Sequence, residues 1–298
     1  MEYVPRAGKK PGGIEVGASV VGGKRAGARD AGTGRAGALN RESFERLYRK
    51  YNDRRFITSD PVEFVHRYDD SRDRELVALL ASSLAFGNVK QIKAGVARAL
   101  DILGAGPAER VTASSPSDLE FDFRQFRHRW ITGGDMASLL AGARRAIREY
   151  GSLGELFCAK LDRSDSDVAP AAGRFASALF EMSGGYRQCL LPSPESGSAC
   201  KRLNLFLRWM VRSDAVDPGG WSEVPPAMLI VPLDTHMRRI SAKLGLTRRQ
   251  AADLRAAREI TRAFREISPE DPVKYDFALT RLGMLRDEAE EDRAGIYC

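Results

Sequence analysis

A lysine and an aspartate, each at the expected start of a helix, are the residues of this 298-residue chain whose types and positions best suit covalent chemistry. Lys201 begins a helix with a basic polar face, and Asp234 follows a short apolar run and opens an amphipathic helix. A lysine amine can attack an electrophilic carbon, and a fixed carboxylate can stabilise positive charge that develops in a transition state. Two helix starts that present a lysine and a carboxylate could therefore carry out chemistry on a nucleic acid. The alternative for Asp234 is a helix cap alone, which is a common use of aspartate.

The helix that begins at Lys201 carries a basic stripe. At about 100° per residue, Lys201, Arg208 and Arg212 fall within about 40° of one another, and Arg202 and Trp209 flank them. No acidic residue stands four positions away to pair with the stripe. A surface of one charge sign is suited to a phosphate backbone. An ordinary solvated helix face is the alternative interpretation.

Helical periodicity dominates the elements that must position these residues. Apolar residues at helical spacing, together with capping signals, predict helices at about 42–51, 61–68, 71–86, 88–104, 135–150, 151–163, 168–182, 199–212, 234–244, 248–267 and 272–284. Two stretches, 105–135 and 183–198, are interrupted by proline and glycine, and only 228–231 resembles a strand. The predicted fold class is all-α, with the segment 42–70 packed alongside the C-terminal helices.

Composition divides the chain into a basic tail and a nearly neutral body. Residues 1–38 are rich in Gly, Ala, Lys and Arg and are expected to be disordered. Residues 39–285 are expected to form one helical domain of two lobes with a cleft between them, followed by a C-terminal tail at 286–298. Of the net charge of +7, the first 40 residues contribute +4, from seven basic and three acidic side chains. Nucleic-acid binding would therefore depend on local patches of the folded part.

Several function classes are disfavoured by the residues present. The four cysteines, at 158, 189, 200 and 298, form no CxxC pair, and no two of the three histidines have metal-ligand spacing. We therefore expect no zinc site, no iron–sulfur cluster and no other cofactor. Glycine-rich phosphate-binding motifs are absent from the sequence. There is neither an apolar stretch of membrane-spanning length nor a secretory signal, so a cytoplasmic location is expected.

Two segments resemble the helix-hairpin-helix DNA glycosylases, a superfamily that includes endonuclease III. VPLDTHMRRISAKLGL is similar to the aspartate-bearing segment of that superfamily, and GSACKRLNLFL is similar to its lysine-bearing segment. LLASSLAFGNVKQI resembles an early helix of these proteins, with Leu84 in place of a glutamine. The long interval from Lys201 to Asp234 is similar to that of the archaeal 8-oxoguanine DNA glycosylases, which also lack the cluster. DPVEFVHRY, LRWMVR, VDPGGW and DPVKYDFALTRLG resemble a bacterial family catalogued as a domain of unknown function, over about residues 42–285.

The resemblance implies a two-lobed helix-hairpin-helix glycosylase-like fold and base excision from damaged duplex DNA by a monomer, with an oxidised purine favoured and with or without AP-lyase activity. Lys201 would attack the sugar C1′ and expel the base, and Asp234 would be its partner. Because both residues open helices after loops and lie in segments that resemble this pair, we expect their functional atoms to approach within about 6 Å. The candidate nucleic-acid contacts are Arg202, Arg208, Arg212 and Arg238, and the candidate base-stacking residues are Trp209 and Trp221. Two alternatives remain: a non-catalytic nucleic-acid-binding helical protein, and a nucleosidase-type hydrolase that acts on a small modified nucleoside.

Overall fold

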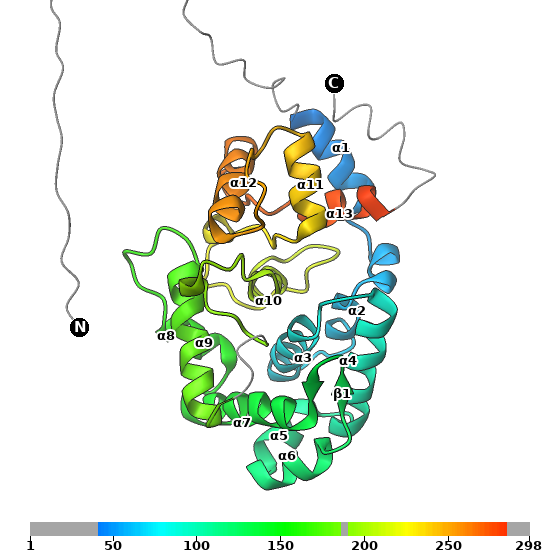
Figure 1. Ribbon diagram of the computed structural model, residues 1–298, viewed down its shortest axis with the longest axis vertical. Helices are drawn as coiled ribbons and strands as arrows, with labels where there is room; N and C mark the ends of the chain where they lie inside the picture. The colour runs from blue at the N-terminus through cyan, green and yellow to red at the C-terminus, as the bar shows by residue number, and fades with distance from the viewer. Residues whose placement is uncertain (1–40, 186–189, 285–298) are drawn as a thin grey trace, which may run out of the picture. The chain divides into compact units, whose positions relative to one another are not determined.

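Helices account for nearly all of the regular structure in the computed structural model, which describes residues 41–185 and 190–284 (Figure 1). Within these ranges the strands form one two-stranded antiparallel sheet, β1 (Arg127–His128) with β2 (Ile131–Thr132). The all-α prediction is therefore confirmed. The tails expected at 1–38 and 286–298 lie outside the described residues. Across the described ranges, the helices are too short or too polar to cross a bilayer.

The helices follow one another in short succession. The α-helices are α1 (Arg41–Tyr51), α2 (Val62–Val65), α3 (Ser71–Ser83), α4 (Val89–Leu103), α5 (Pro107–Ala113), α6 (Pro116–Phe123), α7 (Gly133–Tyr150), α8 (Leu153–Ala159), α9 (Ala169–Ser183), α10 (Lys201–Val211), α11 (Thr235–Lys243), α12 (Leu254–Ile267) and α13 (Asp276–Met284). The 3₁₀ turns are η1 (Arg54–Ser59), η2 (Pro194–Ser196) and η3 (Pro226–Met228).

Side-chain caps set many of the helix starts. Asn88 accepts a hydrogen bond from the Lys90 amide at 2.8 Å and opens α4, which ends at Gly104 with φ of 76°. Thr132 and Asp135 form a reciprocal capping box at the start of α7. Each cap satisfies helix amides that have no intrahelical partner and stabilises its helix by about 1 kcal/mol.

Three expectations about local structure are wrong. The stretch 105–135 holds α5, α6 and the sheet, because Pro107 and Pro116 occupy the first helical turn, where proline is favoured rather than disruptive. Residues 228–231 are not a strand: Met228 ends η3, and 229–231 form an irregular buried segment in which the Val231 amide donates to Thr261 Oγ1 at 3.0 Å. Helix α13 begins at Asp276 rather than at Pro272, after a run of turns.

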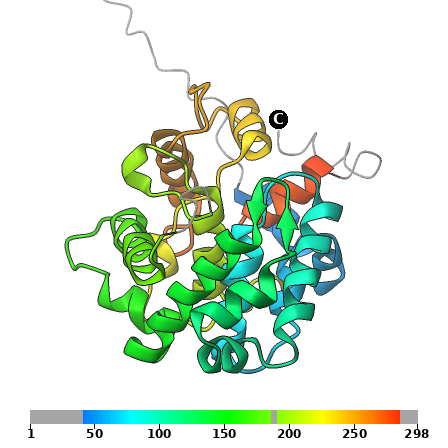
Figure 2. The same ribbon diagram turned by 60° about the horizontal axis from the view of Figure 1, so that its bottom comes forward.

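Aromatic contacts join the start of the described chain to its end. The ring of Phe44 in α1 lies 5.8 Å from that of Phe264 in α12 and 5.3 Å from that of Tyr275, just before α13. Lys274 Nζ also donates to Glu45 Oε1 at 2.8 Å. The expected packing of the N-terminal segment against the C-terminal helices is confirmed for α1. In Figures 1 and 2, α10 lies between this group of helices and the group formed by α2 to α9.

Candidate active site

Lys201 and Asp234 form an ion pair, with Lys201 Nζ 2.9 Å from Asp234 Oδ2. The predicted approach of the two side chains is confirmed. About a third of each side chain is exposed, 37% for the lysine and 32% for the aspartate. The pair is therefore partly shielded from water and still open to a ligand.

The two carboxylate oxygens of Asp234 have different partners. Oδ1 accepts the Met237 amide at 2.7 Å and caps α11, while Oδ2 faces Lys201. Burial opposes the charge on this carboxyl, but Lys201 and the Met237 amide outweigh burial and hold the pKa of Asp234 below its ordinary value. The residue is thus both a helix cap and a fixed anion.

A tight backbone turn directly before α10 positions Lys201 as the first residue of the helix. Cys200 adopts a left-handed conformation with φ of 46°, and its amide donates to Ser198 Oγ at 3.2 Å. Asn204, one turn into the helix, donates from its side chain to the Ala199 carbonyl at 2.9 Å. These contacts fix the first turn of α10, so the position of the lysine backbone is set before any ligand binds.

A cavity of about 170 Å³ contains the pair. Its walls come from the residue pair before α2, from the α3–α4 connection and the start of α4, from α10, from the segment before α11 and from α13. Two further carboxylates, Asp60 and Asp276, line it. Asp60 Oδ2 accepts from Arg281 Nη2 at 2.6 Å, and Asp276 is bonded to Arg208. Burial raises the pKa of Asp276 to about 6, although Arg208 opposes the rise.

The expectation that Arg208 and Arg212 form an exposed, phosphate-facing stripe is wrong. Only 3% and 5% of these residues are exposed, and their guanidinium groups share the buried Asp217 carboxylate. Arg208 also bonds Asp276, while Arg212 donates from Nε to Asp271 Oδ2 at 2.9 Å. Burial disfavours the charged forms, but the carboxylates outweigh it and raise the pKa of both arginines. These partners were missed because none lies one turn along α10: Asp217 follows that helix, and Asp271 and Asp276 lie just before and at the start of α13.

The expectation that Trp209 and Trp221 stack on a base is also wrong, because neither ring is accessible to a ligand. Trp209 is fully buried and Trp221 is 4% exposed. Trp221 stacks on Phe157 with ring centroids 5.3 Å apart and donates from Nε1 to Glu75 Oε1 at 2.8 Å. Both tryptophans belong to the core, where their large apolar area stabilises packing.

The remaining predicted contacts, Arg202 and Arg238, are half-buried. Arg202 lies next to Lys201 in sequence, donates to the Ser83 carbonyl at 3.2 Å, and places its guanidinium 4.9 Å from the centre of the Phe86 ring. Arg238 is in the first turn of α11, one turn beyond Asp234. Both therefore stand within a turn of a member of the ion pair.

An aromatic–arginine cluster lies beside the cavity and consists of the exposed Arg129 and Trp130 and the half-buried Phe86 and Arg202. The rings of Phe86 and Trp130 stack 4.7 Å apart, the Arg129 guanidinium lies 4.7 Å from the Trp130 ring, and Trp130 is 47% exposed. Gly87, which lines the cavity, touches the cluster, because a Cβ built on it would meet Arg129 Nη1 at 2.3 Å. Of these four residues only Arg202 was predicted from the sequence; Phe86, Arg129 and Trp130 were missed, although basic and aromatic residues alternate at 127–130, a pattern typical of nucleic-acid contact.

Within the described ranges, no three His, Cys, Asp or Glu side chains are arranged to hold a metal ion. Each charged side chain that lines the cavity has an oppositely charged partner: Lys201 with Asp234, Arg208 with Asp276, and Asp60 with Arg281.

A family model described as "Protein of unknown function (DUF2400)" matches residues 60–285. The match includes both members of the ion pair and the whole aromatic–arginine cluster. No curated protein and no solved structure matches the chain.

Proposed function

The chain belongs to this family of proteins of unknown function, and from that premise we propose that it is a DNA base-excision glycosylase with lyase activity. Its substrate would be a damaged base in duplex DNA, with an oxidised purine favoured. The observation that carries the proposal is the Lys201–Asp234 ion pair, formed by two helix starts inside a half-open cavity.

Lys201 is the nucleophile in this proposal. After its ammonium loses a proton, the amine attacks C1′ of the damaged nucleotide, and the bond from C1′ to the base breaks. The base leaves with the bonding electrons and takes up a proton. The attached nitrogen then passes a proton to O4′, and its lone pair expels O4′ as a hydroxyl, which opens the sugar and leaves a protonated Schiff base between C1′ and Nζ. The 37% exposure of the lysine side chain gives the sugar access to this nitrogen.

Asp234 stabilises the positive charge that builds on the sugar as the base departs. A carboxylate whose pKa is held below its ordinary value stays ionised throughout the neutral pH range. Because Oδ1 is tied to the Met237 amide, the carboxylate is held in place and needs little reorganisation during the reaction. The same group orients the lysine through Oδ2.

The aromatic–arginine cluster supports a nucleic acid as the substrate. Aromatic faces stack on bases of any sequence, and arginines beside them contact the phosphate backbone. Trp130 is exposed and Arg129 lies over its ring, next to the glycine that lines the cavity. A base flipped from the duplex toward the cavity would leave its neighbours within reach of this platform.

The finer fold assignment, a two-lobed helix-hairpin-helix glycosylase-like architecture, is part of the same proposal. It is supported by the all-helical structure and by the turn that precedes α10, where Gly197 adopts a φ of 76°. The long segment between α10 and α11 is the feature shared with the archaeal 8-oxoguanine enzymes.

Borohydride trapping tests the proposed function directly. Duplex DNA with a single 8-oxoguanine, an oxidised pyrimidine or uracil is incubated with the full chain and sodium borohydride, which reduces the Schiff base to a stable amine. We expect a covalent adduct with the wild type and none with Lys201→Gln. Lys243→Gln, an exposed lysine on α11, is the matched control and should be trapped normally. A Lys201→Gln protein that is trapped as well as the wild type would refute the assignment.

One observation favours a second function, hydrolysis of a small modified nucleoside. Arg208 and Arg212 are buried, which removes two of the four cations expected on a DNA-facing surface. A free nucleoside needs no phosphate contacts. If the chain releases a base from a modified nucleoside while its DNA binding is undetectable at low salt, the nucleosidase takes the place of the glycosylase. Salt-dependent DNA binding without any base release would instead indicate the non-catalytic binding protein.

A further inference from the structure

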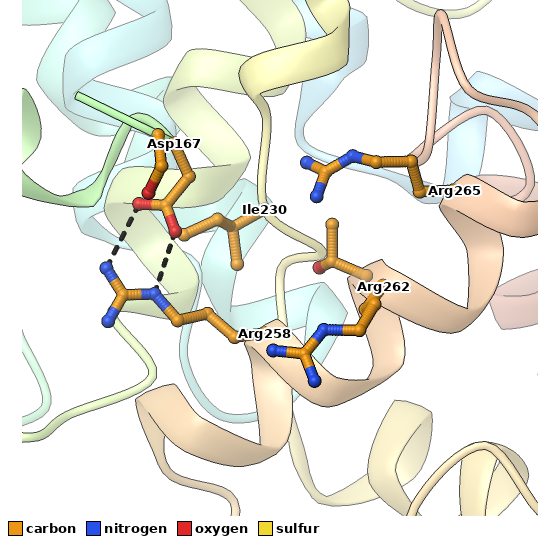
Figure 3. A pocket seen from close by; sticks show the side chains of 7 residues that line it. Asp167, Ile230, Arg258, Arg262 and Arg265 are labelled. Atoms are coloured by element: carbon orange, nitrogen blue, oxygen red, sulfur yellow. Dashed lines mark hydrogen bonds and ion pairs between the residues drawn. The ribbon is translucent and has the colours of Figure 1, made fainter. Parts of the chain in front are cut away.

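A second cavity, of about 360 Å³, shares no lining residue with the cavity around Lys201. Its floor and walls come from α12, from the loop before α9 and from Ile230 (Figure 3). Three arginines of α12, Arg258, Arg262 and Arg265, line it. The sequence comparison and the proposed glycosylase reaction assign no role to these arginines.

Helical spacing puts the three arginines on one face of α12. They stand at positions i, i+4 and i+7, which lie one above another on a helix. The opposite face, with Ala257, Ile260 and Phe264, is buried in the core and fixes the rotation of the helix. The arginines are thus held toward the cavity by packing on the far side.

The guanidinium groups differ in how they are held. Asp167 binds Arg258 through two hydrogen bonds, Nε to Oδ2 at 2.8 Å and Nη2 to Oδ1 at 3.1 Å (Figure 3). Arg265 donates from Nη2 to the Ala227 carbonyl at 2.8 Å. Arg262 is exposed and has no hydrogen-bond or ion-pair partner in the part of the chain that the structure describes. Two guanidinium groups are therefore oriented in advance, and a third is free to close on a ligand.

Charge identifies the kind of ligand. Three guanidinium groups and one carboxylate line the cavity, which leaves two positive charges uncompensated. Like charges one helical turn apart repel each other, so an anion with two negative charges would relieve the repulsion. The planar guanidinium fork matches the oxygens of a phosphate group.

We propose that this cavity is a binding site for a phosphomonoester dianion carried by an organic ligand. Arg262 and Arg265 contact the phosphate oxygens, and Arg258 is positioned by Asp167. The volume exceeds that of a phosphate group, and Ile230 adds an apolar wall for the organic part. The same phosphate chemistry occurs in free nucleotides and at the 5′ end of a nucleic-acid strand.

Titration calorimetry on the full chain at pH 7.5 tests the site, with inorganic phosphate, adenosine 5′-monophosphate and adenosine as probes. We expect the monophosphate to bind more tightly than inorganic phosphate, and adenosine not to bind. Equal binding of adenosine and its monophosphate, or no heat from either phosphate at millimolar concentration, would overturn the proposal.

Matched variants locate the binding. Arg262→Gln and Arg265→Gln should each weaken monophosphate binding about tenfold, as expected when a charged hydrogen bond is lost. Arg255→Gln, an exposed arginine of α12 that does not line the cavity, should leave the affinity unchanged. Arg262 has no partner to lose, so its variant should melt at the wild-type temperature. An equal loss of affinity in Arg255→Gln would show a general attraction of anions to α12 and refute the site.

Competition with short single strands distinguishes the two sources of the phosphate. If a strand with a 5′-phosphate displaces the monophosphate and the same strand with a 5′-hydroxyl does not, the ligand is a strand end; if neither displaces it, the ligand is a free phosphomonoester. Equal displacement by both strands would mean recognition of the diester backbone and would refute the dianion site. Lys201→Gln should bind the monophosphate normally, so a failure of the glycosylase proposal would leave this result intact.

Discussion

The cations at the two ends of α10 differ in their exposure to solvent. Lys201, at the first position of the helix, pairs with one aspartate and keeps 37% of its side chain exposed. Arg208 and Arg212, two and three turns later, are buried. Arg208 pairs with Asp217 and Asp276, and Arg212 pairs with Asp214, Asp217 and Asp271. The same helix therefore presents one cation to a ligand and uses the other two to hold the structure together.

This difference shows that charge alone does not distinguish a binding surface from a structural core. Breaking an exposed ion pair costs little free energy, because water solvates the two separated charges. Such a pair can therefore exchange partners. Breaking a buried ion-pair network is costly, because a charge that loses its partner in the interior is not solvated by water. The number of carboxylates that surround each cation separates the two cases.

Removing the central carboxylate of the buried network should have the largest effect. Asp217→Ala leaves two buried guanidinium groups without their shared partner and should lower the free energy of unfolding by about 3–5 kcal/mol. Urea denaturation measures this loss. Asp122→Ala, which breaks the surface pair with Arg110, should cost less than about 1 kcal/mol. Similar costs for the two variants would mean that the network contributes no more than a surface ion pair.

Neutralising Asp234 should affect activity much more than stability. Asparagine is also a good helix cap, so Asp234→Asn should lower the free energy of unfolding by well under about 1 kcal/mol. The base-excision rate should fall about 10²–10³-fold, because the sugar cation loses its stabilising charge. Single-turnover kinetics on damaged DNA measures the rate.

The matched control for this variant is Asp253→Asn. Asp253 caps α12 through the Ala256 amide at 2.7 Å and pairs with Arg249, so its local chemistry is similar, but it does not line the cavity. Its replacement should leave the excision rate unchanged. If both variants lose activity equally, the loss comes from weakened caps and not from the charge at the cavity.

The aromatic–arginine cluster should contribute to DNA affinity at an intermediate level. Trp130→Ala removes a half-exposed ring and should weaken binding of damaged duplex by about tenfold, the effect of losing one base-stacking contact. Fluorescence anisotropy measures the affinity. Phe121→Ala removes another exposed ring that also has an arginine, Arg124, over its face but does not line the cavity. An equal effect of Phe121→Ala would indicate a loss of general surface contact.

The smallest expected effect is the pH dependence of the Lys201–Asp234 pair. Because the folded state holds the pKa of Asp234 below its ordinary value of 3.8, the carboxylate stabilises the fold above that pH. This contribution is lost as the pH falls through the lowered pKa. The difference in unfolding free energy between the wild type and Asp234→Asn should therefore shrink as the pH is lowered from 7 toward 3. A difference that stays constant over this range would assign the cost of the substitution to something other than the ionised carboxylate.

Much of the helical framework and the central pair could be predicted from the sequence. Helices α1 and α4 have apolar residues at a regular spacing, and α4 also has a side-chain cap; these are local signals. The pairing of Lys201 with Asp234 was predicted because each opens a helix after a loop and because both segments resemble the lysine- and aspartate-bearing segments of the glycosylases. That Asp60 and Asp276 line the same cavity was not predictable. No local sequence pattern brings a residue before α2 and a residue of α13 next to this pair.

Two features gave little local signal. The sheet has strands of only two residues, too short to show alternation, and its turn depends on the left-handed φ of 55° at Arg129. The burial of Arg208 depends on Asp276, 68 positions further along the chain. Long-range ion pairs of this kind follow from the tertiary fold, so helix periodicity alone assigns such cations to the surface.

Gly87 has a consequence for how related chains can diverge. Its φ of 96° suits a residue without a side chain, and the space where a Cβ would stand is occupied by the end of Arg129. A relative that acquires a side chain at position 87 must move the guanidinium away from the Trp130 ring or replace it. Positions 87 and 129 should therefore covary, although one of them contributes no side chain to the contact.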